Sequence, residues 1–331
     1  MATVSIESSG QYGELIRGVG VQFMDVYNQS LLSYSNAVNE AMAVPGNKAT
    51  LLFQTTKTTS KVIHFLQKTG VGYLQTFNEG EAIPQDSRLL GYKTSITPQT
   101  KGSSVVVTMQ AVKTVDYQNS LSEFADLTVA AKETVDRDAF SIFNNAFTAQ
   151  ASLPSNIFGY GDGKPLCSTI HPRKDGGAAQ SNASATGVVL NDTNLEVARV
   201  ALMRQLDDRG KPIVGGSGKL ILLVSPELLK TAVQLVKTDK QVETANNNIN
   251  IYEGLMTVIE SKYLTSATAW FVIDPVLAKL KVVEHELAQT HTHLDPLTLN
   301  QSFFIYSWYA LAWCDWRGIW GSKGDGAAYS A

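Results

Sequence analysis

The sequence is poor in cysteine, in net charge and in long hydrophobic runs. Its two cysteines, Cys167 and Cys314, form no Cys-x-x-Cys motif, so no disulfide framework is predicted. The 27 basic and 30 acidic residues leave a net charge of −3, which provides no basic face for reading nucleic acids. The longest strongly apolar run, Leu220–Val224, is too short to span a membrane, and Met1–Gly20 has no apolar signal region. We therefore expect a soluble protein made in the cytoplasm, with no membrane partner.

Familiar catalytic signatures are also missing. Residues 215–219 resemble a phosphate-binding loop, but that motif needs glycine where Ile213 stands and serine or threonine where Leu220 stands. The glycine-rich stretch 159–163 lacks the spacing of a dinucleotide-binding fingerprint, and no Gly-x-Ser-x-Gly motif occurs. We therefore predict no enzyme activity, no catalytic residues and no cofactor.

Two groups of side chains carry chemistry that a site could use. Cys167 and His171 lie four residues apart beside Pro172, and we interpret them as loop-anchoring residues rather than as a nucleophile and its base. The candidate metal ligands are His285, His291, His293, Glu284 and Asp295. Because the stretch AQTHTHLDP reads as a loop with no evident group to orient the imidazole rings, we interpret this group as a solvated polar loop, with a metal site as the alternative.

The first part of the chain combines a helical segment with extended segments. Apolar residues recur three or four apart between Tyr12 and Met42, which predicts one or two amphipathic helices that stop at Pro45-Gly46. This segment either packs on its own domain or lies across a neighbouring subunit. Residues Thr50–Leu66 and Ser103–Val112 are rich in β-branched side chains and predict strands.

Between these strands lies a polar, turn-rich hairpin, with an outgoing limb at Tyr73–Phe77 and a return limb at Leu89–Pro98. Its few apolar positions cannot bury a core, and an isolated two-stranded ribbon is only marginally stable in water. We therefore expect a neighbouring copy of the chain to order it. The charged residues that we assign to this contact between subunits are Glu79, Glu81, Asp86, Arg88 and Lys93.

A long helix and a region of alternating helices and strands follow. Residues 117–150 contain no glycine or proline and have apolar positions along one face, which predicts a single helix on the order of 45 Å long. The composition changes near Asn191, where Thr193 and Glu196 predict a capping box, and Ser225-Pro226 predicts a second helix start. Strands are predicted over Lys219–Val224, Leu255–Ser261, Ala269–Asp274 and Lys281–Leu287. Ser302–Gly321 is apolar on both sides, which predicts one long strand covered on two faces.

The order of these elements resembles that of the major capsid proteins of tailed phages of the Hong Kong phage type, a fold shared with encapsulin shells. Local motifs agree with the resemblance. Phe77–Pro84 is similar to the start of the hairpin in phage coat proteins, and Gly163–Leu166 with His171-Pro172 is similar to a loop of Mu-like coat proteins. The motifs similar to the end of the inserted domain are Asn248–Asn250, Val258-Ile259, Tyr263-Leu264 and Trp270-Phe271.

The resemblance implies an α+β fold in which an α/β A-domain is inserted into a P-domain. The implied parts are an N-terminal arm over residues 1–46, P-domain segments over 47–70 and 101–190 with the spine helix at 117–150, an extended E-loop hairpin over 71–100, the A-domain over 191–300, and a terminal P-domain strand over 301–331. No removable scaffolding segment precedes the arm, so we expect scaffolding to be a separate protein or unnecessary. Some relatives cross-link through a hairpin lysine, and Lys93 occupies that limb without an identifiable partner.

The function implied is that of a structural head protein of the virion, assembled in the host cytoplasm from pentamers and hexamers into an icosahedral shell around double-stranded DNA. Besides copies of itself, the implied partners are scaffolding, portal and decoration proteins, and packaged DNA whose sequence is not read. An encapsulin-like nanocompartment shell is the alternative with the same fold. An α/β enzyme or ligand-binding protein with its site in residues 191–300 is the alternative from another class.

Overall fold

The computed structural model describes residues 52–86, 89–108, 117–213, 218–238, 250–295, 297–298 and 300–329. The fold is mixed α+β, and the chain divides into two compact units. The described residues of the first unit lie within 99–136 and 286–309, and those of the second lie within 52–98, 137–285 and 310–329. The predicted N-terminal arm, residues 1–46, lies outside the described residues.

A four-stranded sheet with the strand order β11-β8-β6-β7 lies in the second unit. Its strands are β6 (Leu220–Val224), β7 (Met256–Glu260), β8 (Trp270–Ile273) and β11 (Ile319–Ser322). β6 runs parallel to β7 and antiparallel to β8, and β8 pairs in antiparallel fashion with β11. All five residues of β6 are buried, as expected for a central strand covered on both faces.

Two helices supply apolar side chains to the core of this sheet. They are α4 (Asp192–Met203) and α5 (Leu229–Lys237). Leu195 of α4 and Ala232 of α5 are fully buried in one cluster with Leu222 of β6 and Trp270 of β8. This region therefore has a hydrophobic core of its own.

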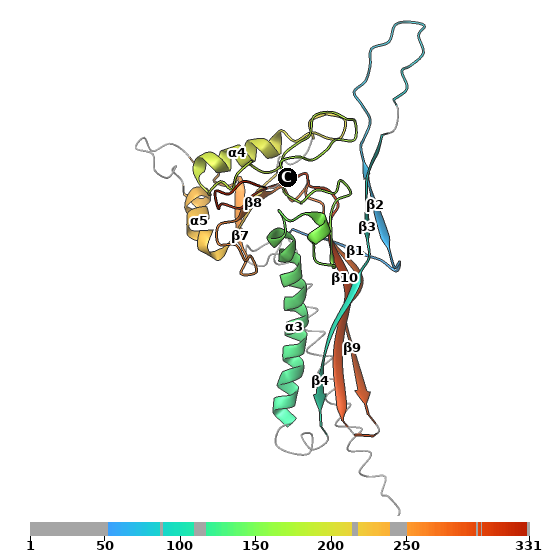
Figure 1. The fold of residues 1–331 in the computed structure, drawn as a ribbon, viewed down its shortest axis with the longest axis vertical. Helices are drawn as coiled ribbons and strands as arrows, with labels where there is room; N and C mark the ends of the chain where they lie inside the picture. The colour runs from blue at the N-terminus through green and yellow to red at the C-terminus, as the bar shows by residue number, and fades with distance from the viewer. Residues whose placement is uncertain are drawn as a thin grey trace, which may run out of the picture. The chain divides into compact units, whose positions relative to one another are not determined.

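The second unit also contains a hairpin and shorter strand pairs. In the hairpin, β2 (Ile63–Lys68) pairs in antiparallel fashion with β3 (Leu90–Ile96). β1 (Gln54–Lys57) runs parallel to the start of β9 (Leu280–Leu294), and β5 (Ile157–Phe158) pairs with the end of β10 (Gln301–Trp313). Figure 1 shows the chain continuing well past the paired strands of the hairpin as an extended loop.

In the first unit, β4 (Gln99–Val107) pairs in antiparallel fashion with β10. The odd-numbered side chains of β10, such as Ile305, are buried, and Leu127 of the long helix α3 (Tyr117–Asn144) packs against Ile305. The even-numbered aromatic side chains Phe304 and Tyr306 on the opposite face are only half-buried. The helix thus covers one face of this strand pair.

Two predicted element boundaries are wrong. The outgoing limb of the hairpin is β2 rather than Tyr73–Phe77, which has no regular secondary structure, because the loop between the limbs is longer than the turn residues suggested. The spine helix ends at Asn144 instead of continuing to Gln150. There, Asn144 binds the backbone of Tyr263 and Thr265, and such side-chain hydrogen bonds compete with helix continuation.

The predicted helix starts need correction as well. Asn191, not Thr193, caps α4, since its side-chain oxygen accepts a 2.8 Å hydrogen bond from the Asn194 amide, while Glu196 instead pairs with Arg199. Ser225 makes no capping bond, because its hydroxyl donates to the Ala267 carbonyl, and a 3-10 turn precedes α5.

The C-terminal segment is not the single long strand that we predicted. It divides into β10 and β11, which belong to different sheets. The turn between them contains Gly318, whose φ of 82° favours glycine and whose Cβ would lie 2.6 Å from the Ala278 amide nitrogen. The apolar residues of this segment therefore lie on two strands, β10 and β11, with a turn between them, rather than on one strand.

Candidate functional site

The loop that joins β2 to β3 exposes apolar side chains to solvent. Leu74 is 100% exposed and Ile83 is 74% exposed, and Tyr73 and Phe77 are also largely uncovered. A small turn at Asn78–Glu81 gives local order, because the Asn78 amide donates to the Glu81 carboxylate at 3.0 Å, and this bonding lowers the pKa of Glu81. The loop therefore presents apolar surface that the described part of the chain leaves uncovered.

The charged residues predicted for the contact between subunits occupy different environments. Glu79 and Glu81 lie on the exposed part of the loop, and Lys93 is an exposed residue of β3 opposite Leu66. Asp86 lies at the base of the loop, and Arg88 lies outside the described residues. The structure brings none of Glu79, Glu81 and Lys93 into a common contact.

Asp86 has partners within its own chain that the sequence reasoning missed. Its carboxylate accepts hydrogen bonds from Arg209 Nη1 at 2.8 and 2.9 Å and from the Gly72 amide at 2.6 Å. Lys211 Nζ donates to the Val71 carbonyl at 2.7 Å. The only sequence signal was the turn motif Asp-Asp-Arg-Gly at 207–210, which indicates a turn but not what the turn contacts.

The base of the hairpin is anchored by a tightly packed loop of residues 159–164. A Cβ at Gly161 would lie 2.4 Å from the Lys93 carbonyl oxygen, so only glycine permits this close approach to β3. Gln67 of β2 accepts a hydrogen bond from the Tyr160 hydroxyl and donates to Asp315 at 3.3 Å. Burial, reinforced by nearby carboxylates, raises the pKa of Tyr160, which keeps the hydroxyl a donor.

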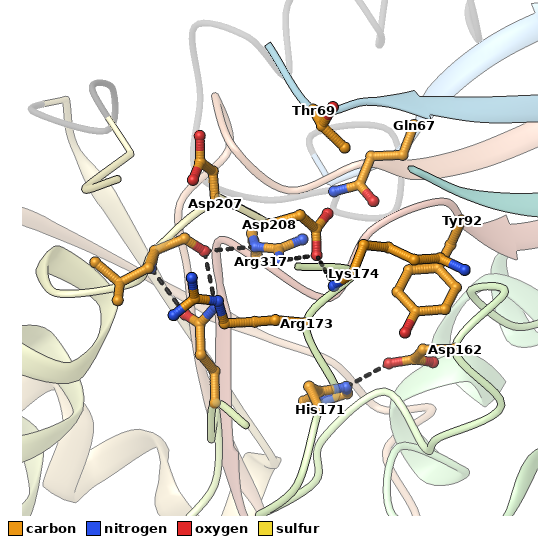
Figure 2. Close-up of polar contacts among 12 residues, drawn as sticks. Gln67, Thr69, Tyr92, Asp162, His171, Arg173, Lys174, Asp207, Asp208 and Arg317 are labelled. Carbon is orange, nitrogen blue, oxygen red and sulfur yellow. Dashed lines mark hydrogen bonds and ion pairs between the residues drawn. The ribbon is translucent and has the colours of Figure 1, made fainter. Parts of the chain in front are cut away.

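A buried ionic cluster lies beneath this anchor. The Arg317 guanidinium is 3.1 Å from Asp208 (Figure 2). It is also 3.1 Å from Asp315, and its Nε donates to the Leu206 carbonyl at 2.8 Å. All three charged side chains are at most 4% exposed. Burial alone opposes the charged guanidinium, but the two carboxylates outweigh it and raise the pKa of Arg317. The cluster links the hairpin base, through Asp315, to residues 206–208.

Both ring nitrogens of His171 have polar partners within the same region of the chain. Its Nδ1 lies 2.7 Å from Asp162 Oδ2 (Figure 2), and its Nε2 lies 3.1 Å from Asn182 Oδ1. The ring stacks on Trp316 with centroids 4.2 Å apart. Cys167 is buried, and burial raises the pKa of its thiol, which disfavours the reactive thiolate. The contacts of His171 agree with its interpretation as a loop-anchoring residue.

The histidines near the C-terminus lie on a strand and not in the polar loop that we predicted. β9 extends to Leu294, so His285, His291 and His293 all belong to it. Its hydrogen bonding to β10 keeps the chain extended further than the loop-like composition suggested. His291 stacks on Tyr306 of β10 with ring centroids 5.6 Å apart. Among the described residues, no group of three or more His, Cys, Asp and Glu side chains is placed to hold a metal ion.

No helix in the described ranges is both long enough and apolar enough to cross a membrane. No curated protein matched the sequence.

Several solved capsids share the fold. The chain is 15% identical to the subunit of the bacteriophage JBD30 capsid, with a TM-score of 0.52 over 68% of this chain and 93% of that one. A Mycobacterium phage Patience chain matches with 15% identity and a TM-score of 0.52 over 92% of this chain and 88% of that one. The mature capsid of bacteriophage PhiM1 matches with 15% identity and a TM-score of 0.51, over 84% of this chain and 87% of its own. These similarities confirm the predicted major capsid fold.

A family model described as phage capsid protein matches residues 91–322. The matched region begins in the return limb of the hairpin and ends with β11, so it includes the long helix and the four-stranded sheet. Because this region is more than half of the chain, the protein belongs to the phage capsid protein family and is a structural component of a capsid shell.

Proposed function

We propose that copies of this chain assemble as pentamers and hexamers into an icosahedral shell that encloses double-stranded DNA. The observation that carries the proposal is the exposed apolar surface of loop 69–86, which includes the fully exposed Leu74. Apolar side chains gathered on an exposed loop favour association, because burial against a partner removes that surface from water. In the family, copies of the same chain supply such a partner.

The remaining parts of the proposal follow from charge and from the family. The net charge of −3 favours a shell that contains DNA without reading its sequence, since few phosphates can be neutralised. We propose a virion protein without enzymatic activity that assembles in the host cytoplasm, where scaffolding, portal and decoration proteins are candidate partners. We further propose Glu79, Glu81, Arg88 and Lys93 as contacts between subunits. Asp86 already binds Arg209 of its own chain, so we propose that it contacts a neighbouring subunit only in addition to that pair.

Electron microscopy and light scattering of the purified full chain test the proposal. We expect closed particles with hexameric and pentameric capsomers across a range of salt and pH, with DNA inside particles recovered from infected cells. Protein cargo in place of DNA would favour the nanocompartment alternative. A strict monomer in every condition, even with a co-expressed scaffold, would contradict assembly.

A paired substitution tests the role of the loop. Leu74→Ser should lower particle yield severalfold while the unassembled subunit melts as the wild type does, because the side chain has no contacts to lose within the subunit. Val276→Ser is the matched control, since Val276 is 67% exposed but lies outside the loop. Equal yields from both variants would remove loop 69–86 from the assembly contact.

A further inference from the structure

Residues 207–211 form a rigid turn that presents two cationic side chains. The Asp207 amide donates to the Lys211 carbonyl at 2.8 Å, and the Asp207 carboxylate accepts from the amides of Arg209 and Lys211 at 2.8 Å each. Gly210 has a φ of 76°, a conformation that favours glycine. The turn therefore holds its backbone closed by its own hydrogen bonds, with Arg209 and Lys211 extending from it.

Both cations contact the base of loop 69–86 at its two ends. Arg209 binds Asp86 through both carboxylate oxygens, and the same carboxylate accepts the Gly72 amide, so residues 72 and 86 are joined across the loop. Lys211 binds the Val71 carbonyl and lies over the Tyr73 ring, with its Nζ 4.7 Å from the centroid. The contacts thus close the loop at its base.

These contacts are partly shielded from water. The Arg209 side chain is 14% exposed and the Asp86 side chain is 36% exposed. Such a pair is screened by salt less than a fully exposed pair. One nitrogen, Arg209 Nη1, donates to both Asp86 oxygens, so the contact depends on where this single cationic donor is held.

Beyond the base, the loop has only local order. Residues 73–85 are exposed throughout, and hydrogen bonds between Asn78 and Glu81 form a turn within this segment. The contacts at the base of the loop must therefore determine the direction of this exposed segment. These contacts are the ones with the 207–211 turn.

We infer that Arg209 and Lys211 form a clamp that holds the base of the loop against the same chain, and that Arg209 is the positioning residue for the exposed apolar segment. The clamp orders residues 71, 72 and 86 in the unassembled subunit and leaves residues 73–85 available. When another copy of the chain binds the tip of the loop, the base is already ordered, so less conformational entropy is lost on binding. Only this last consequence, for shell formation, rests on the proposed function.

Hydrogen exchange of the unassembled full chain tests the clamp directly, because the Gly72 amide is one of its hydrogen bonds. Arg209→Ala should speed exchange in peptides covering residues 70–74 roughly tenfold, the change expected for weakening one charge-assisted hydrogen bond. Asp86→Asn, at an exposed position, should have a similar effect without endangering folding. Compared with Arg209→Ala, Arg209→Lys should restore part of the protection, since it keeps the charge but not the planar guanidinium.

Arg199→Ala is the matched control, because it breaks the comparable pair with Glu196 on α4 and should leave exchange at residues 70–74 unchanged. Two results would overturn the inference: exchange within twofold of the wild type in both Arg209→Ala and Asp86→Asn, or an equal increase across all peptides, which indicates general destabilisation. Particle yield is measured separately. If the wild type forms no shells, the proposed function fails, while the exchange result still decides whether the clamp exists.

Discussion

Apolar side chains are buried in the four-stranded sheet but exposed to solvent in the loop between β2 and β3. In the sheet, Leu222 is completely buried among residues from α4, α5 and β8. In the loop, Leu74 is completely exposed and lies beside other uncovered apolar residues. The two regions have similar apolar side chains, but only the sheet uses them to stabilise the subunit.

This difference separates what serves folding from what serves assembly. Burying a leucine contributes on the order of 1.5–3 kcal/mol to folding, whereas an exposed leucine contributes nothing until a partner covers it. The base of the hairpin lies between these extremes, because Gln67 reaches the buried Arg317–Asp315–Asp208 cluster while Asp86 contacts Arg209 near the surface. Substitutions in each region can therefore test the comparison.

Arg317→Ala should have the largest effect on stability. It removes the cation between Asp315 and Asp208, which leaves the buried Asp208 without this ion pair and Asp315 with Lys279 alone, and it should cost about 3–5 kcal/mol of unfolding free energy. Urea unfolding of the subunit measures the change. Arg199→Ala, which breaks a more exposed pair, should cost less than about 1 kcal/mol, and equal losses for the two variants would contradict the importance of the cluster.

The same substitution at two leucines should give opposite results. Leu222→Ala should lower the unfolding free energy by about 2–5 kcal/mol, because it leaves a cavity in the core of the sheet. Leu74→Ala should change it by less than about 0.5 kcal/mol, because its side chain is already in water. Thermal or urea unfolding of both variants measures this. A Leu74→Ala loss of several kcal/mol would show that the loop packs against its own subunit.

Alkaline pH should lower the unfolding free energy of the subunit by a smaller amount, through the buried thiol of Cys314. Burial raises the pKa of the Cys314 thiol to about 11, above its ordinary value of 9.0. Because the folded-state pKa is the higher one, this contribution to stability is fully present below pH 9 and is lost as the pH rises towards 11. Between pH 8.5 and 10.5 we expect a loss of about 1–2 kcal/mol from this group.

Urea unfolding under reducing conditions at both pH values measures this loss. Cys314→Ala should lose correspondingly less stability over the same interval, whatever its stability at pH 8.5. An unchanged loss in the variant would assign the alkaline effect to other groups, such as Tyr160 and Cys167, whose pKa values burial also raises.

Patterns within short stretches predicted the elements well. The apolar run at 220–224 became the buried strand β6, and the uninterrupted pattern after Tyr117 became the long helix α3. Predictions at element ends were weaker, because side chains such as those of Asn144 and Asn191 form specific hydrogen bonds there. The division of the last apolar segment into β10 and β11 also depended on the sheets that each strand joins.

The candidate site shows the same limit. The sequence alone indicated an extended polar hairpin that cannot form its own core, and the order of its elements was enough to predict the capsid fold. It could not indicate that Asp86 meets Arg209, because the two residues are 123 positions apart and an ion pair leaves no periodic pattern. Local sequence patterns indicate whether a segment prefers helix or strand and which of its faces is buried, because residues close in the sequence determine both properties. Contacts between distant polar side chains, such as those of Arg317 with Asp208, were decided only by the tertiary structure, because the packing of the whole unit brings these groups together and excludes water from them.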